Sequence, residues 1–132
     1  MSKKNKYWID RNRYYELKYF CLQYSNWKRA YATIIDAISR AAYDIPSKTN
    51  IPSDLTGSIA TKKLYLSENM QLVEKAIMTT DESMYHYLLV GVTEGKSYSY
   101  LKTVMNIPCS RDNYYELYRR FFWELDKLKE RI

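Results

Sequence analysis

Apolar residues recur at intervals of three and four along most of the chain, which is the spacing that places them on one face of an α-helix. No stretch alternates apolar and polar residues for long, and the 132 residues include only three glycines and three prolines. Strands therefore have little support from the sequence. The pattern predicts an all-α protein with an N-terminal helical hairpin, a long helix and a C-terminal helix-turn-helix.

The N-terminal part of the chain is expected to begin with two helices. The first starts at Asp10 or Asn12, and the second runs from Asn26 to about Ala42 after a break and a new cap at Ser25. Because the two helices are joined so tightly, they should form a hairpin. Their inward residues are expected to be Tyr14, Leu17, Phe20, Cys21 and Tyr24, followed by Trp27, Tyr31, Ile34, Ile38 and Ala41.

A stretch with two prolines, YDIPSKTNIPSD at residues 43–54, predicts a loop that can act as a hinge. Beyond it, Leu55–Thr79 can form a long helix whose apolar residues follow a heptad-like spacing, with Lys63 as an interruption. Such spacing fits either packing within one chain or a coiled coil between copies, and the 15 tyrosines of the chain suit an interface. A homodimer is therefore expected. The apolar stripe consists of Ile59, Leu66, Met70, Val73 and Ile77.

Residues 81–132 contain two short helices, a turn and a longer helix, in the order that a helix-turn-helix requires. The first short helix is expected over Asp81–Val92, with its first residue as the cap, and Gly95 ends it. Ser97 can cap the second short helix. Its inner face is assigned to Tyr100, Leu101 and Val104.

A short turn separates that helix from the last one. Asn106 tolerates the left-handed conformation that closes a helix, and Pro108 supplies a rigid exit. Ser110 is a suitable N-cap for the last helix. The residues of this helix that are expected to face inward are Tyr114, Leu117, Phe121, Leu125 and Leu128.

The side chains left exposed at the start of the last helix suit contact with DNA. Arginine can donate two hydrogen bonds to guanine, asparagine can pair with adenine, and tyrosine and serine can bind phosphate. An ordinary amphipathic helix with solvated charges would carry similar residues, and this alternative stays open. Arg111 and Asn113 are placed nearest the base edges, and Arg119 and Arg120 nearer the phosphates. The candidate DNA-binding residues are Ser110, Arg111, Asn113, Tyr115, Arg119 and Arg120.

The segment EGKSYSYLKTVMNIPCSRDNYYELYRRFFWEL resembles the C-terminal helix-turn-helix of phage late-gene transcriptional regulators of the RinA/ArpU type and, more distantly, region 4 of sigma factors. The resemblance implies a DNA-binding role and an origin in a temperate phage or prophage. The sequence departs from the pattern at Leu101, where alanine is common, at Asn106, where glycine is common, and in the aromatic block 121–123. The matching residues are Gly95 before the first helix of the pair, Leu101 and Val104 on its inner face, and Ile107 in the turn.

The formal net charge of +6 agrees with a polyanionic partner but is modest. The basic excess lies at the two ends, since residues 1–50 hold 10 basic and 4 acidic side chains and residues 101–132 hold 7 and 5. Cys21 and Cys109 form no CxxC motif, so reduced thiols are expected and no metal ligand is assigned. The chain lacks an apolar run of membrane-spanning length and a signal-peptide pattern, which favours the cytoplasm of a bacterial host cell.

The sequence shows no motif of an enzyme. It contains no glycine-rich phosphate loop, nucleophile elbow or carboxylate cluster with metal-ligand spacing, so no catalytic residue and no cofactor is assigned. His86, the single histidine, is expected to be a partly buried structural residue. The tetrapeptide Tyr-Tyr-Glu-Leu occurs at 14–17 and again at 114–117, and is treated as a coincidence in a tyrosine-rich chain.

Two classes of function remain. The first is a transcriptional regulator in which residues 81–132 bind double-stranded DNA and residues 1–80 support the fold or a homodimer. The second is a phage interaction protein, either a small terminase-like packaging subunit or an inhibitor of a host defence system such as an anti-CRISPR. Host RNA polymerase or a defence protein is a further candidate partner, and a membrane is not expected.

Overall fold

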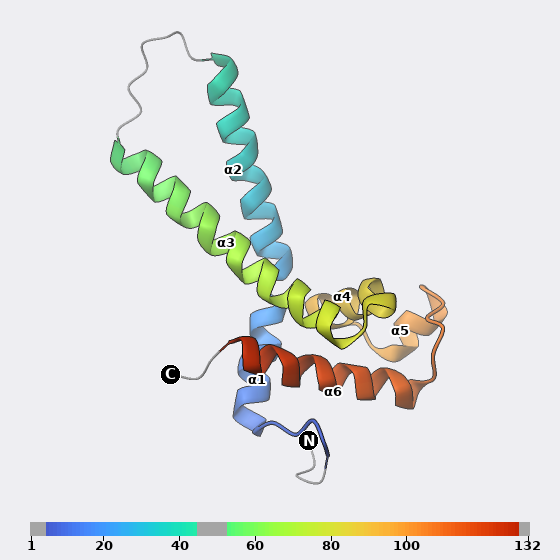
Figure 1. The fold of residues 1–132 in the computed structure, drawn as a ribbon. Coiled ribbons are helices and arrows are strands. Elements are labelled where there is room, and N and C mark those ends of the chain that lie inside the picture. Colours follow the sequence, from blue (N-terminus) through green and yellow to red (C-terminus); the bar gives the residue numbers. More distant parts are fainter. Residues whose placement is uncertain (1–4, 45–52, 130–132) are drawn as a thin grey trace.

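The computed structural model describes residues 5–44 and 53–129, and all regular structure in these ranges is helical, with no strand (Figure 1). The predicted all-α class is confirmed. The elements in chain order are α1 (Arg11–Cys21), α2 (Tyr24–Asp44), α3 (Ser53–Thr80), the short 3-10 helix η1 (Glu82–Met84), α4 (Tyr85–Glu94), α5 (Tyr98–Thr103) and α6 (Arg111–Leu128).

The N-terminal hairpin is present, but α2 and α3 form it rather than α1 and α2 (Figure 1). Asp10 caps α1 by accepting hydrogen bonds from the backbone N–H groups of Asn12 and Arg13. The break between α1 and α2 falls at residues 22–23 and not at Ser25. Leu22 keeps right-handed helical backbone angles, so this short break bends the chain without reversing it.

The α2–α3 hairpin extends away from the other helices as a long arm (Figure 1). Its helices reach further than the sequence suggests, since residues 43–44 and 53–54 of the expected loop are helical. The remainder of that loop, residues 45–52, lies outside the described residues. Near the base of the arm, the Tyr24 hydroxyl donates a hydrogen bond to the Glu74 carboxylate and joins the two helices.

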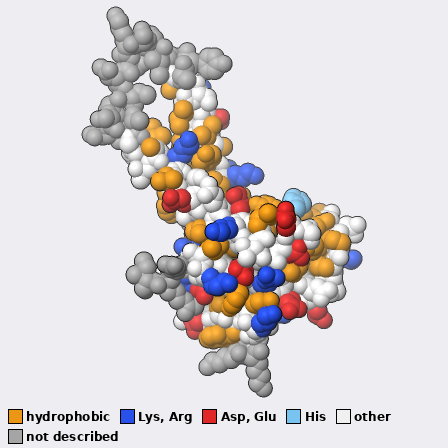
Figure 2. All heavy atoms as spheres, in the orientation of Figure 1, with side chains coloured by type: hydrophobic (Ala, Val, Ile, Leu, Met, Phe, Trp, Pro, Cys, Tyr) orange, Lys and Arg blue, Asp and Glu red, His pale blue; other side chains and the backbone are white. Residues whose placement is uncertain are grey.

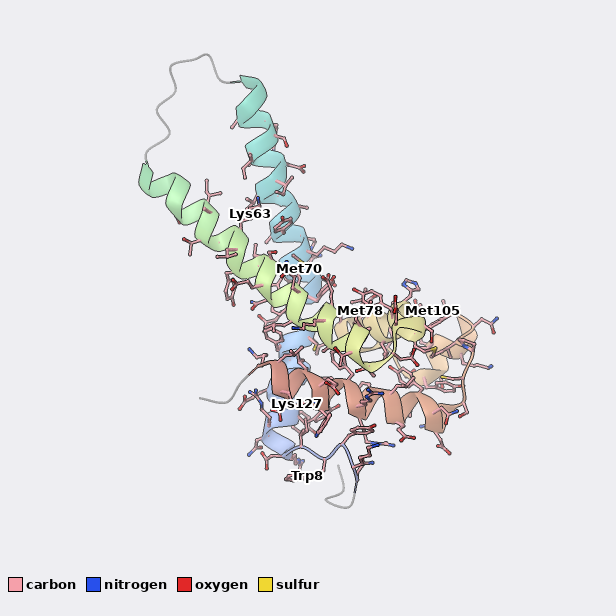
Figure 3. All side chains as sticks on the ribbon, viewed as in Figure 1. Trp8, Lys63, Met70, Met78, Met105 and Lys127 are labelled. Carbon is pink, nitrogen blue, oxygen red and sulfur yellow. The ribbon has the colours of Figure 1, made fainter. Side chains whose placement is uncertain are left out.

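The predicted apolar stripe of α3 is largely confirmed, because Leu66, Val73 and Ile77 are buried. Met70 is half-buried on the same helix, as is Lys63, which interrupts the stripe (Figure 3). The inward position expected for Ile38 on α2 is wrong, since 44% of this residue is exposed. Two helices alone can cover only a narrow strip of each other, and Ile38 lies outside that strip.

The caps and turns expected in the C-terminal part are confirmed. The Asp81 carboxylate accepts a hydrogen bond from the Ser83 N–H at the start of η1, which precedes α4. Gly95 ends α4 in the left-handed conformation with φ 68°, and Ser97 caps α5 by accepting a bond from the Tyr100 N–H. Asn106 is left-handed as well, with φ 55°. These local signals place the boundaries of α4 and α5.

The inner face of α5 differs from the expectation at Val104, which is 64% exposed. Leu101 does face inward and is fully buried. Ile107 occupies the remaining space beneath α5, where it is also fully buried, and its N–H donates to the Leu101 carbonyl. Val104 is not part of this buried face because the chain turns at the end of α5 and places Ile107 there instead.

The hydrophobic core lies where α6 packs between α3 and α1, with α4 and α5 closing one end. It joins the two regions 1–80 and 81–132, and Arg13 on α1 reinforces the contact by donating to Asp126 at 2.7 Å and to the Lys129 carbonyl. Because α6 is covered from two sides, its buried face is wider than one stripe and includes Phe122 and Glu124. The largest fully buried side chains are Tyr114, Phe121, Phe122, Leu17, Ile77, Leu88, Leu101, Ile107, Leu125, Val73 and Cys21.

Candidate nucleic-acid interface

The start of α6 is held in place by its cap and by the turn before it. The Ser110 hydroxyl accepts a hydrogen bond from the Asn113 N–H at 3.2 Å. The Tyr98 hydroxyl on α5 donates to the Cys109 carbonyl at 2.6 Å and so ties the turn to the preceding helix. Ser110, Arg111 and Asn113 are exposed. A fixed, exposed helix N-terminus of this kind presents backbone N–H groups and the positive end of the helix dipole to an anion.

The six residues predicted to contact DNA do not share one face of α6. With 3.6 residues per turn, Arg111, Tyr115 and Arg119 lie along one edge, where Tyr115 and Arg119 line a groove together with residues of α1. Asn113 and Arg120 lie along the opposite edge, where they line a hollow with η1. Ser110 sits at the helix end. The exposed strip between the two edges begins with Asp112 and Glu116, so Lys and Arg side chains are interspersed with acidic ones on the molecular surface (Figure 2).

The edge beside η1 has a hollow of about 460 Å³ in which Arg120 is already engaged. Its guanidinium donates to the Thr79 carbonyl at 3.3 Å and lies 3.9 Å from the Glu124 carboxylate. Asp81 and Glu116 line the same hollow and add negative charge to it. This edge is therefore less suited to phosphate than the sequence suggests, and Arg120 helps to fix α6 against α3.

The edge beside α1 has a larger groove, about 670 Å³, and the described residues that line it include arginines and no acidic residue. The Nε of Arg119 is buried there and has no hydrogen-bond partner in the described part of the chain. In the lining of the groove, the hydroxyls of Tyr14 and Tyr118 are hydrogen-bonded to each other at 2.7 Å, and burial raises the pKa of Tyr118. The groove is lined by Asn5, Arg11, Tyr14, Tyr15, Tyr115, Tyr118 and Arg119.

The sequence interpretation missed the contribution of α1 to this groove. Arg11, Tyr14 and Tyr15 are far from α6 in the sequence, and only the packing of α1 against α6 brings them there. The sequence does contain one indication of this groove, the repeated Tyr-Tyr-Glu-Leu at 14–17 and 114–117, because tyrosines from both copies line it.

Within residues 5–44 and 53–129, no group of three or more His, Cys, Asp or Glu side chains is placed to hold a metal ion. Cys21 and Cys109 are free thiols, and burial raises the pKa of each. His86 is exposed on α4, so its expected partial burial is wrong. No helix in the described part of the chain has the length and apolar character needed to cross a membrane.

Comparison with protein-family models, with curated proteins and with solved structures gives no match for this chain. The similarity to RinA/ArpU-type regulators therefore stays a prediction that rests on the residues quoted for it. Any assignment of function has to come from the geometry of the molecule itself.

Proposed function

We propose that this protein is a DNA-binding regulator that contacts duplex DNA with the first turn of α6. The observation that carries the proposal is the exposed, fixed start of this helix, where Arg111 and Asn113 stand at the surface behind the Ser110 cap. The short helix α5 and a rigid turn precede it, as in helix-turn-helix proteins. In that class, residues at the N-terminal end of the second helix contact base edges in the major groove.

The charge distribution favours an end-on approach of α6 to the groove. Asp112 and Glu116 occupy the exposed strip along the helix and would repel phosphates if α6 lay flat in the groove. At the helix end, Arg111 and the backbone N–H groups attract phosphate and base acceptors. Arg119 can reach the phosphate backbone from the edge beside α1, whereas Arg120 acts mainly through its bonds to Thr79 and Glu124.

The test is a titration of labelled duplex DNA, including intergenic DNA from the source genome, at several salt concentrations. Arg111→Ala is expected to weaken the preference for one base by about 1–3 kcal/mol, because a bidentate contact to guanine is lost. Arg119→Ala should weaken binding to all duplexes and lower the slope of log affinity against log salt by about one unit. Arg40→Ala, which removes an exposed arginine from the arm, is the matched control. This variant should change neither the base preference nor the salt dependence of duplex binding.

Absence of salt-dependent binding to every duplex would contradict the proposal. The start of α6 would then be a scaffold, and the inhibitor of a host defence system would become the better interpretation. An equal loss of affinity in Arg40→Ala and Arg119→Ala would show that only the total charge matters.

The proposal includes a homodimer, because helix-turn-helix proteins commonly bind two half-sites with two copies. The stripe on α3 is not the interface along its whole length, since Leu66, Val73 and Ile77 are buried within one chain. Apolar residues remain exposed on the arm, with Ile38 on α2 and Leu64, 58% exposed, on α3. We propose that a second copy covers this part of the arm.

Sedimentation at tens of micromolar, the order of magnitude at which weak protein association is seen, should show a dimer. Leu64→Glu is expected to shift the protein to a monomer, because a charge would be buried against the second copy. Ser99→Glu places the same charge on exposed α5 and should leave the dimer intact. A monomeric wild type would remove the dimer from the proposal, and a ring of many copies would favour the packaging subunit instead.

A further inference from the structure

The helices α1 and α6 begin with similar arrangements of arginine and tyrosine. In each, an arginine lies three residues before the first tyrosine of Tyr-Tyr-Glu-Leu, and its guanidinium lies over the ring of the second tyrosine. The Cζ of Arg11 is 5.9 Å from the ring centre of Tyr15, and the Cζ of Arg111 is 5.7 Å from that of Tyr115. These distances are within the range of cation–π pairs. The repeated tetrapeptide thus gives the same local structure twice.

Three of the four residues in these Arg–Tyr pairs, all but Arg111, line one groove. Tyr15 and Tyr115 line the groove between α1 and α6 from opposite helices, and the hydrogen-bonded Tyr14 and Tyr118 lie beside them. The ring centres of Tyr14 and Tyr15 are 5.3 Å apart, and those of Tyr115 and Tyr118 are 6.0 Å apart. The groove therefore has rigid aromatic walls whose inner rings are fixed by the core.

The groove is also suited to bind an anion. Among residues 5–44 and 53–129, those that line it include Arg11 and Arg119 but neither aspartate nor glutamate. The buried Nε of Arg119 lacks an acceptor among the residues that the structure describes, and an unpaired buried donor of a charged group is costly. A phosphate oxygen in the groove would satisfy it. The volume of about 670 Å³ is within the range of sites that hold small organic ligands.

A further tyrosine extends the platform beyond the groove. Tyr19, 60% exposed, lies one turn after Tyr15 on α1, and the two rings stack with an interplanar angle of 24°. The ammonium of Lys18 is 5.8 Å from the ring centre of Tyr15. Tyr15 is 38% exposed, so both rings are accessible in part and have cations beside them. Proteins that hold single-stranded nucleic acid combine aromatic rings, on which bases stack, with cations that bind the phosphates.

We propose that the groove between α1 and α6 binds a single-stranded segment of nucleic acid. Bases stack on Tyr15 and Tyr115, and Arg11 and Arg119 hold the phosphates between them. The ligand is single-stranded because the bases of a duplex are stacked on one another, which leaves their faces unable to stack on the two tyrosines. A phosphotyrosine peptide would use Arg119 but leave the Tyr15–Tyr19 stack without a role. The site goes beyond the proposed duplex contact, since it needs residues of α1 and neither Ser110 nor Asn113.

The experiment follows binding of a short labelled oligothymidylate by fluorescence anisotropy at several salt concentrations. Tyr15→Ala should weaken binding about tenfold, which corresponds to the loss of one base–aromatic stack. Tyr15→Phe keeps the ring face and should bind like wild type. Arg119→Ala should lower the log–log salt slope by about 0.7, as expected for one phosphate contact to a single strand.

The matched control is Tyr100→Ala, because Tyr100 also has a cation over its ring but lies outside the groove. The ammonium of Lys96 is 4.8 Å from its ring centre. This variant should bind oligothymidylate like wild type. Thermal unfolding of each variant shows whether it is folded at the assay temperature, and only folded variants enter the comparison.

Three results would overturn the proposal. These are wild-type affinity in a folded Tyr15→Ala, an equal loss in Tyr100→Ala, and a phosphotyrosine peptide that binds more tightly than the oligonucleotide. Parallel titrations with duplex DNA separate this site from the start of α6. Tyr15→Ala should leave duplex binding unchanged, and Asn113→Ala should leave single-strand binding unchanged, so either proposal can fail while the other stands.

Discussion

Replacing Phe121 with alanine is expected to lower the free energy of unfolding by about 3–5 kcal/mol. Phe121 is fully buried in the core that α6 forms with its neighbours, and its ring centre is 4.9 Å from that of Phe122. The substitution removes buried apolar surface and leaves a cavity that the surrounding helices fill only in part. Leu125→Ala, also at a fully buried position, should cost about 2–5 kcal/mol.

Urea titration followed by circular dichroism measures these losses, provided that the slope of unfolding free energy against urea is unchanged. Val104→Ala is the matched control. The spacing of apolar residues assigns Val104 to the inner face of α5, whereas it is exposed in the structure, so its truncation should change stability by no more than about 0.5 kcal/mol. A large loss in Val104→Ala, or none in Phe121→Ala, would contradict the burial pattern of the C-terminal helices.

The helix ends that sequence predicts well are those fixed by neighbouring residues. Ser97 and Ser110 each cap the helix expected of them, Asp10 is one of the two residues expected at the start of α1, and Gly95 and Asn106 take the left-handed conformation. A cap needs only a side-chain oxygen and the N–H groups two or three residues away, so its energetics are contained within the local sequence. Contacts with distant parts of the chain therefore have little influence on where these helices begin and end.

The pairing of helices is harder to predict because periodicity shows that a face is apolar without showing what covers it. The tight connection between α1 and α2 suggests a hairpin, but the pairing of α2 with α3 decides the arrangement. Ile38 fits the stripe of α2 and is still exposed, because none of the described helices other than α3 lies beside the outer part of α2 (Figure 1). Phe122 and Glu124 are buried because α6 has neighbours on two sides.

The candidate site shows the same division between local and distant information. The exposure of Arg111 and Asn113 follows from their place after the Ser110 cap, and the sequence indicates it. Arg119 and Arg120 sit on different edges with different surroundings, which depends on the positions of α1 and α3. The groove with Arg11 and Tyr15 forms only because α1 packs against α6. The sequence shows that the tetrapeptide is repeated, but not that tyrosines of both copies line one groove.

The contact between α4 and α6 predicts a second large effect, at Gly91. A Cβ atom at this position would overlap the hydroxyl of Tyr114 and lie 3.3 Å from the ring carbon that carries it. Tyr114 is almost completely buried, so its ring cannot move into solvent to make room. Gly91→Ala is therefore expected to destabilise the protein by about 3 kcal/mol, at the upper end for overpacking, although alanine is the better helix former.

Tyr114→Phe should reverse most of that loss because it removes the overlapping atom. The Tyr114 hydroxyl is buried and makes no hydrogen bond with the residues that the structure describes, so its removal alone is expected to leave stability unchanged or raise it by about 1 kcal/mol. In Gly91→Ala/Tyr114→Phe, the new methyl group meets a ring carbon that needs to shift by only a few tenths of an ångström. Urea unfolding of the four proteins should give a coupling free energy of about 1–3 kcal/mol. If the changes in unfolding free energy of the two substitutions are additive, the absence of a side chain at Gly91 is not what makes room for the Tyr114 hydroxyl.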